Sequence, residues 1–314
     1  MDNKTRSSEK LAIAITKLAS KQTYYTIRFF ADRDRVADAY RAYGYFRWVD
    51  DVIDDVAASS AERIAFVHRQ KSLLEAGYRS ERIPDLCPEE WMLVDLIHSD
   101  HEKNSGLRMY LRQMMDVMIF DAERGSRLIS QSELSEYTRK LATAVTEAMY
   151  YFIGHDDPSP RGEARYMAVT AAHVTHMLRD ALEDVENGYI NIPREVLASR
   201  GISPREVTSS AYRQWVCERV QFARKYFEAA RGCTAQVRNL RCRLAGFAYT
   251  ARFEWMLGAI ERDCYCLRRE YPERKSWRAG LWMAWSTLTS VFAFSRLQNG
   301  ENRLAPQPVR IGKR

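Results

Sequence analysis

Two acidic clusters at helical spacing are the residues of this chain that are best suited to chemistry. Asp50 and Asp54 stand four positions apart in FRWVDDVIDDV, and Asp180 and Asp184 repeat that spacing in LRDALEDVENGY. Four residues make just over one helical turn, so both members of a pair project from one face of a helix. If two such helices face each other, their negative charge requires cations between them.

This pattern predicts a magnesium site. Carboxylate oxygens at this density suit Mg²⁺, which uses a few carboxylates, keeps some water and takes further oxygens from a phosphorylated substrate. Either cluster alone is also compatible with a solvated helix surface, and Asp55 is expected to be a solvated partner of a basic side chain. The predicted metal ligands are Asp50, Asp51, Asp54, Asp180 and Asp184.

The elements that must position these carboxylates are long helices. Glycine and proline are confined to a few short stretches, and no alternating strand pattern competes with the helical periodicity between them. Apolar and aromatic residues recur at spacings of three and four from 34 through 55, and further helices are expected over 8–25, 161–187 and 204–234. The sequence therefore predicts an all-α protein.

The length of 314 residues is enough for one large helical domain. We expect this domain to cover residues 1–298, followed by a basic, flexible tail over 299–314 that has no role in the chemistry. Residues 279–295 carry no charge and are at the short limit for spanning a bilayer. They are interpreted as a packed terminal helix, with a segment that dips into a membrane as the alternative.

The formal net charge of +7 is spread along the chain, with an excess of basic residues from 268 to 278 and again near the end. Such a balance fits a phosphorylated substrate or an anionic membrane, and no nucleic-acid-binding motif accompanies it. Six cysteines without a CxxC pair, in a chain that opens MDNKTRSSEK, predict a reducing compartment. We therefore expect a cytoplasmic protein that binds no nucleic acid, and its association with a membrane is left open.

With both clusters on helices, the sequence resembles the squalene and phytoene synthase family over most of its length. In that family an arginine precedes the first acidic motif by three positions, as Arg47 precedes Asp50 here. The family's second motif, LRDxxxD followed by a turn and a proline, matches the run from Leu178 to Pro193. The resemblance implies an isoprenoid-synthase type of helical bundle around a central cavity.

Softer matches and departures accompany these motifs. MIFDAE with Asp121, LATAV, and ARFEWMLGAIERDCY with Phe253 resemble other segments of the family. Thr146 replaces a glycine of the family, and His173 and His176 stand where it generally has Gln and Asn. The histidines are interpreted as hydrogen-bonding a diphosphate or a neighbouring helix, with ligation of a softer metal ion as the alternative.

The resemblance implies a reaction of farnesyl or geranylgeranyl diphosphate at the acidic motifs. Mg²⁺ would neutralise the departing diphosphate, and the predicted catalytic residues are Asp50, Asp54, Asp180, Asp184 and Arg47. The resulting allyl cation would be shielded by aromatic faces, although aromatic residues at helical spacing more often belong to a core. The predicted substrate-binding residues are Arg47, Arg179, His176, His173, Tyr24, Tyr43, Phe46 and Phe253.

The expected function is the head-to-head condensation of two prenyl diphosphates, through a cyclopropyl diphosphate, to a squalene- or phytoene-type product. The alternative is a single-substrate terpene cyclase on the same fold, which the loss of the family's Gln and Asn favours. A non-catalytic relative that binds a lipid or a partner protein is ranked last, because both acidic motifs are intact. The chain length of the substrate and the use of NADPH stay open.

Overall fold

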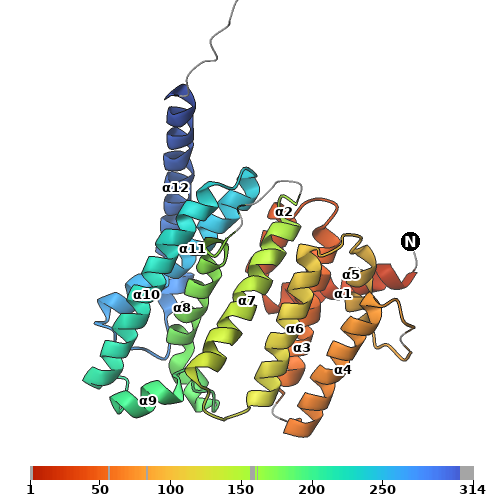
Figure 1. Ribbon diagram of the computed structural model, residues 1–314, viewed down its shortest axis with the longest axis horizontal. Helices are drawn as coiled ribbons and strands as arrows, with labels where there is room; N and C mark the ends of the chain where they lie inside the picture. The colour runs from red at the N-terminus through yellow and green to blue at the C-terminus, as the bar shows by residue number, and fades with distance from the viewer. Residues whose placement is uncertain (1–2, 56, 83, 156–159, 161, 305–314) are drawn as a thin grey trace, which may run out of the picture.

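The computed structural model describes residues 3–304 apart from 56, 83, 156–159 and 161. Within these residues the chain forms α-helices, one 3-10 helix and no strand (Figure 1), which confirms the predicted all-α class. The elements are α1 (Asn3–Ala19), α2 (Lys21–Phe30), α3 (Val36–Ile53), α4 (Ser60–Tyr78), α5 (Glu90–Ser99), α6 (Gly106–Arg124), α7 (Gln131–Phe152), α8 (Ala164–Glu186), α9 (Arg194–Arg200), α10 (Ser210–Ala235), α11 (Leu240–Arg262), the 3-10 helix η1 (Pro272–Lys275) and α12 (Trp277–Leu304).

Helix boundaries follow local capping chemistry. The expected helix over 8–25 is broken at Ser20, whose hydroxyl oxygen accepts a hydrogen bond from the backbone N–H of Thr23 at 3.1 Å and so begins α2. Within the expected helix over 204–234, α10 begins only after Ser209, which caps it in the same way. Helix α9 falls outside the predicted elements, because seven residues are too few to show a periodic pattern.

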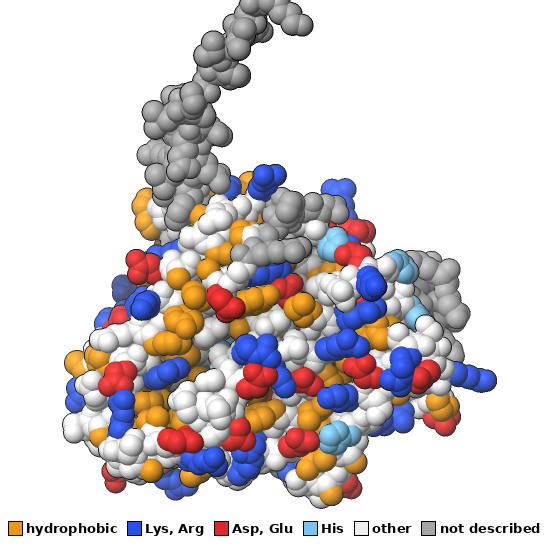
Figure 2. All heavy atoms as spheres, viewed as in Figure 1, with side chains coloured by type: hydrophobic (Ala, Val, Ile, Leu, Met, Phe, Trp, Pro, Cys, Tyr) orange, Lys and Arg blue, Asp and Glu red, His pale blue; other side chains and the backbone are white. Residues whose placement is uncertain are grey.

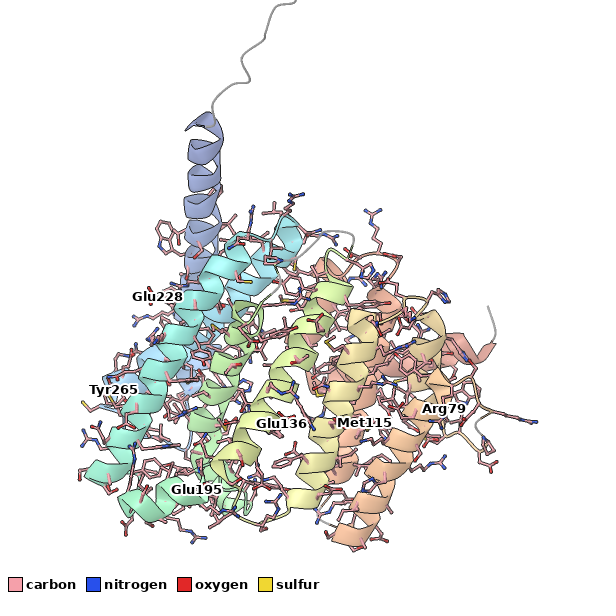
Figure 3. The ribbon with its side chains drawn as sticks, viewed as in Figure 1. Arg79, Met115, Glu136, Glu195, Glu228 and Tyr265 are labelled. Carbon is pink, nitrogen blue, oxygen red and sulfur yellow. The ribbon has the colours of Figure 1, made fainter. Side chains whose placement is uncertain are left out.

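Two buried clusters hold the bundle together. The first is built mainly from α1 to α6 and part of α7. It includes Tyr45 of α3 and Met115 of α6, and Figure 3 labels Met115. The second is built mainly from α8, α10 and α11 and includes Leu178 and Phe227. Helix α7 packs against α6 on one side and against α8 on the other. Side chains from the two halves of the chain therefore meet along α7.

Gly44 allows α1 to make close backbone contact with α3, the helix that carries the first acidic motif. A Cβ atom at position 44 would lie 3.0 Å from the Cα atom and 3.2 Å from the carbonyl oxygen of Ala12. These backbone atoms cannot turn aside, so a side chain here would push the helices apart. Arg41, buried on the same helix, donates from Nε to the Ser8 hydroxyl at 3.0 Å. Helix α1 thus fixes how α3 lies in the bundle.

Helices α3, α6 and α8 run toward the lower edge of the bundle as drawn in Figure 1. Helix α9 lies along that edge and carries Glu195 (Figure 3), whose carboxylate accepts a hydrogen bond from the backbone N–H of Gln131 at 3.0 Å. Because Gln131 is the first residue of α7, this bond ties α9 to the helix shared by both clusters. The acidic motifs, near the ends of α3 and α8, lie toward the same edge.

Helix α12 packs on α11 and continues past the end of the bundle in Figure 1. It contains the expected terminal segment 279–295 and runs to Leu304, so the predicted domain end at residue 298 falls inside it. The part of the predicted tail beyond Leu304 lies outside the described residues. Among the residues that the structure describes, no helix is both long and apolar enough to cross a membrane. On the face shown in Figure 2, basic and acidic side chains are interspersed over the bundle.

Candidate active site

The first acidic motif occupies the C-terminal end of α3. Asp50 and Asp51 lie in its last turn, and Asp54 caps it. The Arg47 guanidinium donates from Nη1 to Asp50 at 3.3 Å and also pairs with Asp51. Burial and the nearby Asp54 carboxylate raise the pKa of Asp50 to about 6 despite this arginine, and burial also raises the pKa of Asp54. The motif therefore holds more negative charge than its own arginine compensates.

The second acidic motif lies near the C-terminal end of α8. Arg179 donates from Nε to Asp180 at 2.6 Å. Asp184 accepts a hydrogen bond at 2.8 Å from the side-chain amide of Asn191, which follows the helix. Burial and the Asp180 carboxylate nevertheless raise the pKa of Asp184 to about 6. This motif too is short of positive charge.

Asp121 of α6 adds a further carboxyl group to the same region. Its pKa is raised to about 7 by burial, with smaller contributions from the Asp50 and Asp54 carboxylates of the first motif. The hydroxyl of Tyr137, on α7, donates a hydrogen bond to Asp121 at 3.0 Å and acts in the opposite direction. Asp121 therefore lies close enough to the first motif to respond to its charge.

Arg124, one turn later on α6, connects this region to the second motif. It donates from Nη1 to the side-chain oxygen of Asn191 at 3.0 Å, while the nitrogen of the same amide donates to Asp184. The Arg124 guanidinium also lies 5.3 Å from the ring centre of Tyr189. Burial raises the pKa of Tyr189, and so does the Asp54 carboxylate of the first motif. Side chains from α3, α6 and the segment after α8 thus meet at one end of the bundle.

The ends of α3 and α8 suit a cation. The last carbonyl groups of a helix and the negative end of its dipole lie at its C-terminus, where both acidic motifs are found. Among the described residues, no three acidic, histidine or cysteine side chains are arranged so as to enclose a metal ion by themselves. An ion that uses few protein ligands and completes its shell with water and phosphate oxygens, as Mg²⁺ does, fits this donor set.

His173 and His176 are half-buried side chains of α8 whose Nε2 atoms are buried. Their ring centres are 5.3 Å from that of Tyr137 and 4.8 Å from that of Phe253, respectively. Burial, with a smaller effect from nearby arginines, lowers the pKa of His173 to about 4 and that of His176 to about 3, so both rings are neutral near pH 7. Neither Nε2 atom has a hydrogen-bond partner among the described residues. A buried polar atom in this state is suited to bind a ligand.

The sequence pattern of the family described as squalene/phytoene synthase matches residues 16–279. The chain belongs to the squalene/phytoene synthase family. This result confirms the resemblance that the two acidic motifs indicate, and it covers all of the elements that carry them.

Two curated relatives of this family member are presqualene diphosphate synthases. The one from Zymomonas mobilis subsp. mobilis is 28% identical over 202 residues, which are 63% of this chain and 64% of that protein. The one from Rhodopseudomonas palustris is 26% identical over 219 residues, which are 68% of this chain and 74% of that protein. The chain thus spans just under two thirds of the length of the first relative.

Solved structures of the family share the fold. A squalene synthase from Alicyclobacillus acidocaldarius superposes with a TM-score of 0.68 at 19% identity and covers 85% of this chain and 98% of that one. A dehydrosqualene synthase in complex with a ligand gives a TM-score of 0.67 at 14% identity, covering 94% of this chain and 98% of that one. At these identities the likeness establishes the fold alone.

The four aromatic residues predicted to bind substrate in this synthase-family chain lie in different surroundings. Phe253 is buried beside the ring of His176. Tyr43, on α3 two turns before the first motif, is half-buried. Phe46 belongs to the first buried cluster, and Tyr24 packs against that cluster. The structure thus places both Phe46 and Phe253 among core side chains and brings Phe253 beside the ring of His176.

Three residues near the motifs escape prediction from the sequence. Arg124 and Tyr137 approach from α6 and α7, far from either acidic motif along the chain, although the MIFDAE segment does indicate their neighbour Asp121. Asn191 stands between the turn at Gly188 and Pro193, and those two residues mark a turn without identifying its polar contact. Only the folded chain shows that these side chains support the motifs.

Proposed function

We propose that this chain condenses two prenyl diphosphates head to head, with release of diphosphate, to a squalene- or phytoene-type product. The observation that supports this best is the pair of under-compensated acidic motifs near the C-terminal ends of α3 and α8, which Asp121 and Arg124 of α6 connect, in a bundle of the squalene/phytoene synthase family. Carboxylates arranged in this way suit the binding of diphosphate groups through divalent cations.

The names of the relatives support this class of substrate. Two are presqualene diphosphate synthases, and the structural neighbours include a squalene synthase and a dehydrosqualene synthase. We take the substrate to be farnesyl or geranylgeranyl diphosphate and the first product to be a cyclopropyl diphosphate. NADPH enters only if the final hydrocarbon is reduced.

Magnesium is the cation that we assign to the site. Asp50, Asp54, Asp180 and Asp184 would hold it, with Asp51 at the exposed edge of the first motif. Mg²⁺ bound there supplies a Lewis acid that neutralises charge on the departing diphosphate.

Arginine and histidine side chains would bind the diphosphate oxygens. Arg47 and Arg179 already contact the motif carboxylates, and a planar guanidinium bonds phosphate oxygens in the same two-pronged manner. The Nε2 atoms of His173 and His176 would donate hydrogen bonds that they lack among the described residues. Phe253 would shield the cationic carbon from water, since its ring packs beside the second histidine.

Asp121 and Tyr137 offer a place for the proton that is released when a cyclopropane ring closes. With a pKa of about 7, Asp121 is close to half-protonated near neutral pH. The Tyr137 hydroxyl donates to its Oδ2 atom at 3.0 Å. We assign the proton to Asp121 Oδ2, with Tyr137 holding that carboxyl group in place.

We place this enzyme in the cytoplasm. None of its six cysteines, all of which the structure describes, forms a disulfide, which supports a reducing compartment. Its contact with a membrane is a separate proposal that rests on helix α12.

Product analysis tests the reaction. The purified protein would be incubated with Mg²⁺ and a series of prenyl diphosphates from geranyl to geranylgeranyl, with and without NADPH, and the products identified by mass spectrometry. We expect products with twice the carbon number of the substrate, and a cyclopropyl diphosphate when a required reductant is withheld. Products of unchanged carbon number from every substrate would instead identify a single-substrate cyclase. Complete absence of turnover would favour the non-catalytic relative.

A further inference from the structure

One face of α12 is apolar and uncovered. Its large hydrophobic side chains are exposed by 71% at Trp277, 61% at Leu281, 70% at Trp285, 48% at Leu288 and 64% at Phe292. At 3.6 residues per turn these five positions fall within an arc of about 80° around the helix. We call them the α12 stripe. A contiguous apolar surface of this kind marks a site of interaction with another molecule.

The opposite face of α12 attaches the helix to the bundle. Thr287 and Val291 are buried, and Val291 packs in a cluster with Phe247 of α11. The Trp282 ring lies 5.6 Å from the ring of Trp255, also on α11. The α12 stripe is therefore not the surface that holds this helix in place. It faces outward while the helix remains docked.

The charge around the stripe is basic. Arg278 is exposed, with its guanidinium 5.7 Å from the ring centre of Trp277, and no acidic residue lies between Trp277 and Phe292. From Trp277 to the end of the chain the sequence has six basic residues and one acidic residue. Tryptophan, leucine and phenylalanine on one face, together with flanking cations, are typical of a helix that lies in the headgroup region of an anionic membrane.

We infer that α12 is an interfacial lipid-binding helix that lays the α12 stripe on the surface of an anionic bilayer. Arg278 would meet lipid phosphate groups while the stripe enters the boundary of the acyl chains. Because its other face is docked on α11, the helix meets the membrane along its side. A second copy of the chain is disfavoured as the occupant, since pairing two such stripes would bring basic residues of like charge together.

Helix α11 contacts both α12 and the helix of the second acidic motif, α8. Its Trp255 contacts Trp282 of α12, and its Phe253, two positions earlier, contacts His176. Prenyl diphosphates and their hydrocarbon products partition into membranes, so a lipid-facing wall beside the site would shorten their path. The membrane inference rests on the surface of α12 and not on the acidic motifs. If vesicle binding fails, the proposed reaction is unaffected and is still tested by product analysis.

Co-sedimentation of the purified protein with lipid vesicles tests the inference. We expect wild-type protein to bind phosphatidylcholine vesicles that contain phosphatidylglycerol more tightly than vesicles of phosphatidylcholine alone. The double variant Trp285→Ser with Phe292→Ser should lower the partition coefficient by more than about tenfold, because two large apolar side chains are lost from the contact. Arg278→Gln should lower binding to the anionic vesicles by about fivefold and have less effect on the neutral ones.

Leu18→Ser is the matched control. Leu18 is 91% exposed on α1, so this change removes an equally exposed apolar side chain from a different helix and should leave vesicle binding unchanged. All variants alter exposed positions, and unchanged circular dichroism and thermal midpoints would establish that they fold. Binding by the double variant equal to wild type, or an equal loss in Leu18→Ser, would overturn the inference. So would a dimer in the absence of vesicles, seen by sedimentation equilibrium, that the double variant dissociates.

Discussion

The two acidic motifs meet the same electrostatic problem in different ways. The first carries its counter-charge on its own helix, where Arg47 contacts Asp50 from one turn away. In the second, Asp184 depends on Asn191 beyond the end of α8 and, through that amide, on Arg124 of α6. Asp180 also has a counter-charge on its own helix, in Arg179, so the contrast lies at Asp184: local sequence supports Asp50, whereas tertiary structure supports Asp184.

In neither motif do the nearby donors fully neutralise the negative charge of the carboxylates. One carboxyl group in each motif, Asp50 in the first and Asp184 in the second, has its pKa raised to about 6. Burial is the main cause in both, and the partner carboxylate one turn away adds to it. The motifs thus differ in how they are supported but share the same unmet need for positive charge.

The largest expected effect comes from neutralising either motif. Asp50→Asn and Asp180→Asn should each lower the rate of Mg²⁺-dependent diphosphate release by more than about a hundredfold. Both variants should stay folded, because relieving the repulsion between carboxylates does not weaken a core. Asp55→Asn is the control, since this exposed carboxylate accepts a hydrogen bond from the backbone N–H of Ala57 at 2.9 Å and should keep normal activity. Near-normal turnover in either motif variant, or activity that survives chelation of divalent metal, would refute the assigned site.

A smaller effect is expected at Arg124, and it should separate the two motifs. Arg124→Met removes the donor that holds Asn191, so the apparent affinity for Mg²⁺, measured by titrating activity, should fall by about tenfold. Arg127→Met, which breaks an outer ion pair with Glu133 at 2.7 Å, should leave that affinity unchanged. Equal behaviour of the two variants would show that the second motif does not need support from α6.

Arg47→Lys addresses the local support of the first motif. Lysine keeps the charge but loses the planar fork that contacts Asp50 and Asp51. We expect a decrease in kcat of about threefold to tenfold, because the proposed contact with the departing diphosphate is weakened. A steady-state comparison with Arg179→Lys would show whether the two arginines have matching roles. Unaltered kinetics in Arg47→Lys would assign this residue to an ordinary salt bridge.

The smallest expected effect concerns stability at Asp121, whose pKa responds to the charge of the first motif. Its folded pKa of about 7 is above the usual carboxyl value. Its contribution to the free energy of unfolding is therefore present at acid pH and is lost as the pH rises through about 7. Without Mg²⁺, the free energy of unfolding measured in urea should decrease between about pH 5 and about pH 8, and Asp121→Asn should make this decrease smaller by on the order of 1 kcal/mol. Asp50 and Asp184, whose pKa values are also raised, contribute the remainder. An identical pH dependence in the variant would contradict this assignment.

Local patterns predict much of the fold. Periodicity and the positions of glycine and proline place a helix over 34–55, observed as Val36–Ile53, and another over 161–187, observed as Ala164–Glu186. The same patterns do not show the break at Ser20, because a capping serine within an otherwise helical run gives only a weak signal.

The candidate site is predictable only in part, for a related reason. Both acidic motifs and Arg47 can be recognised in the sequence, because the spacing and order of residues within one helix are local properties. Arg124 and Tyr137 are not visible, because their contacts with Asn191 and Asp121 form only when α6, α7 and the segment after α8 are packed together. Tertiary packing likewise decides that Phe46 and Phe253 lie in different buried clusters and that Phe253 lies beside His176.

The two buried clusters have a consequence for how the chain folds. The first takes nearly all of its members from residues 12–153, and the second takes nearly all of its members from residues 171–271. Domains form from their N-terminal part first during synthesis, so the half that bears Asp50 can collapse while the ribosome is still making α8. Arg47 on the same helix then screens the first motif before the second exists. Completion of α8 closes the site as a late step, and a stalled chain that ends before it would carry one folded half and no catalytic centre.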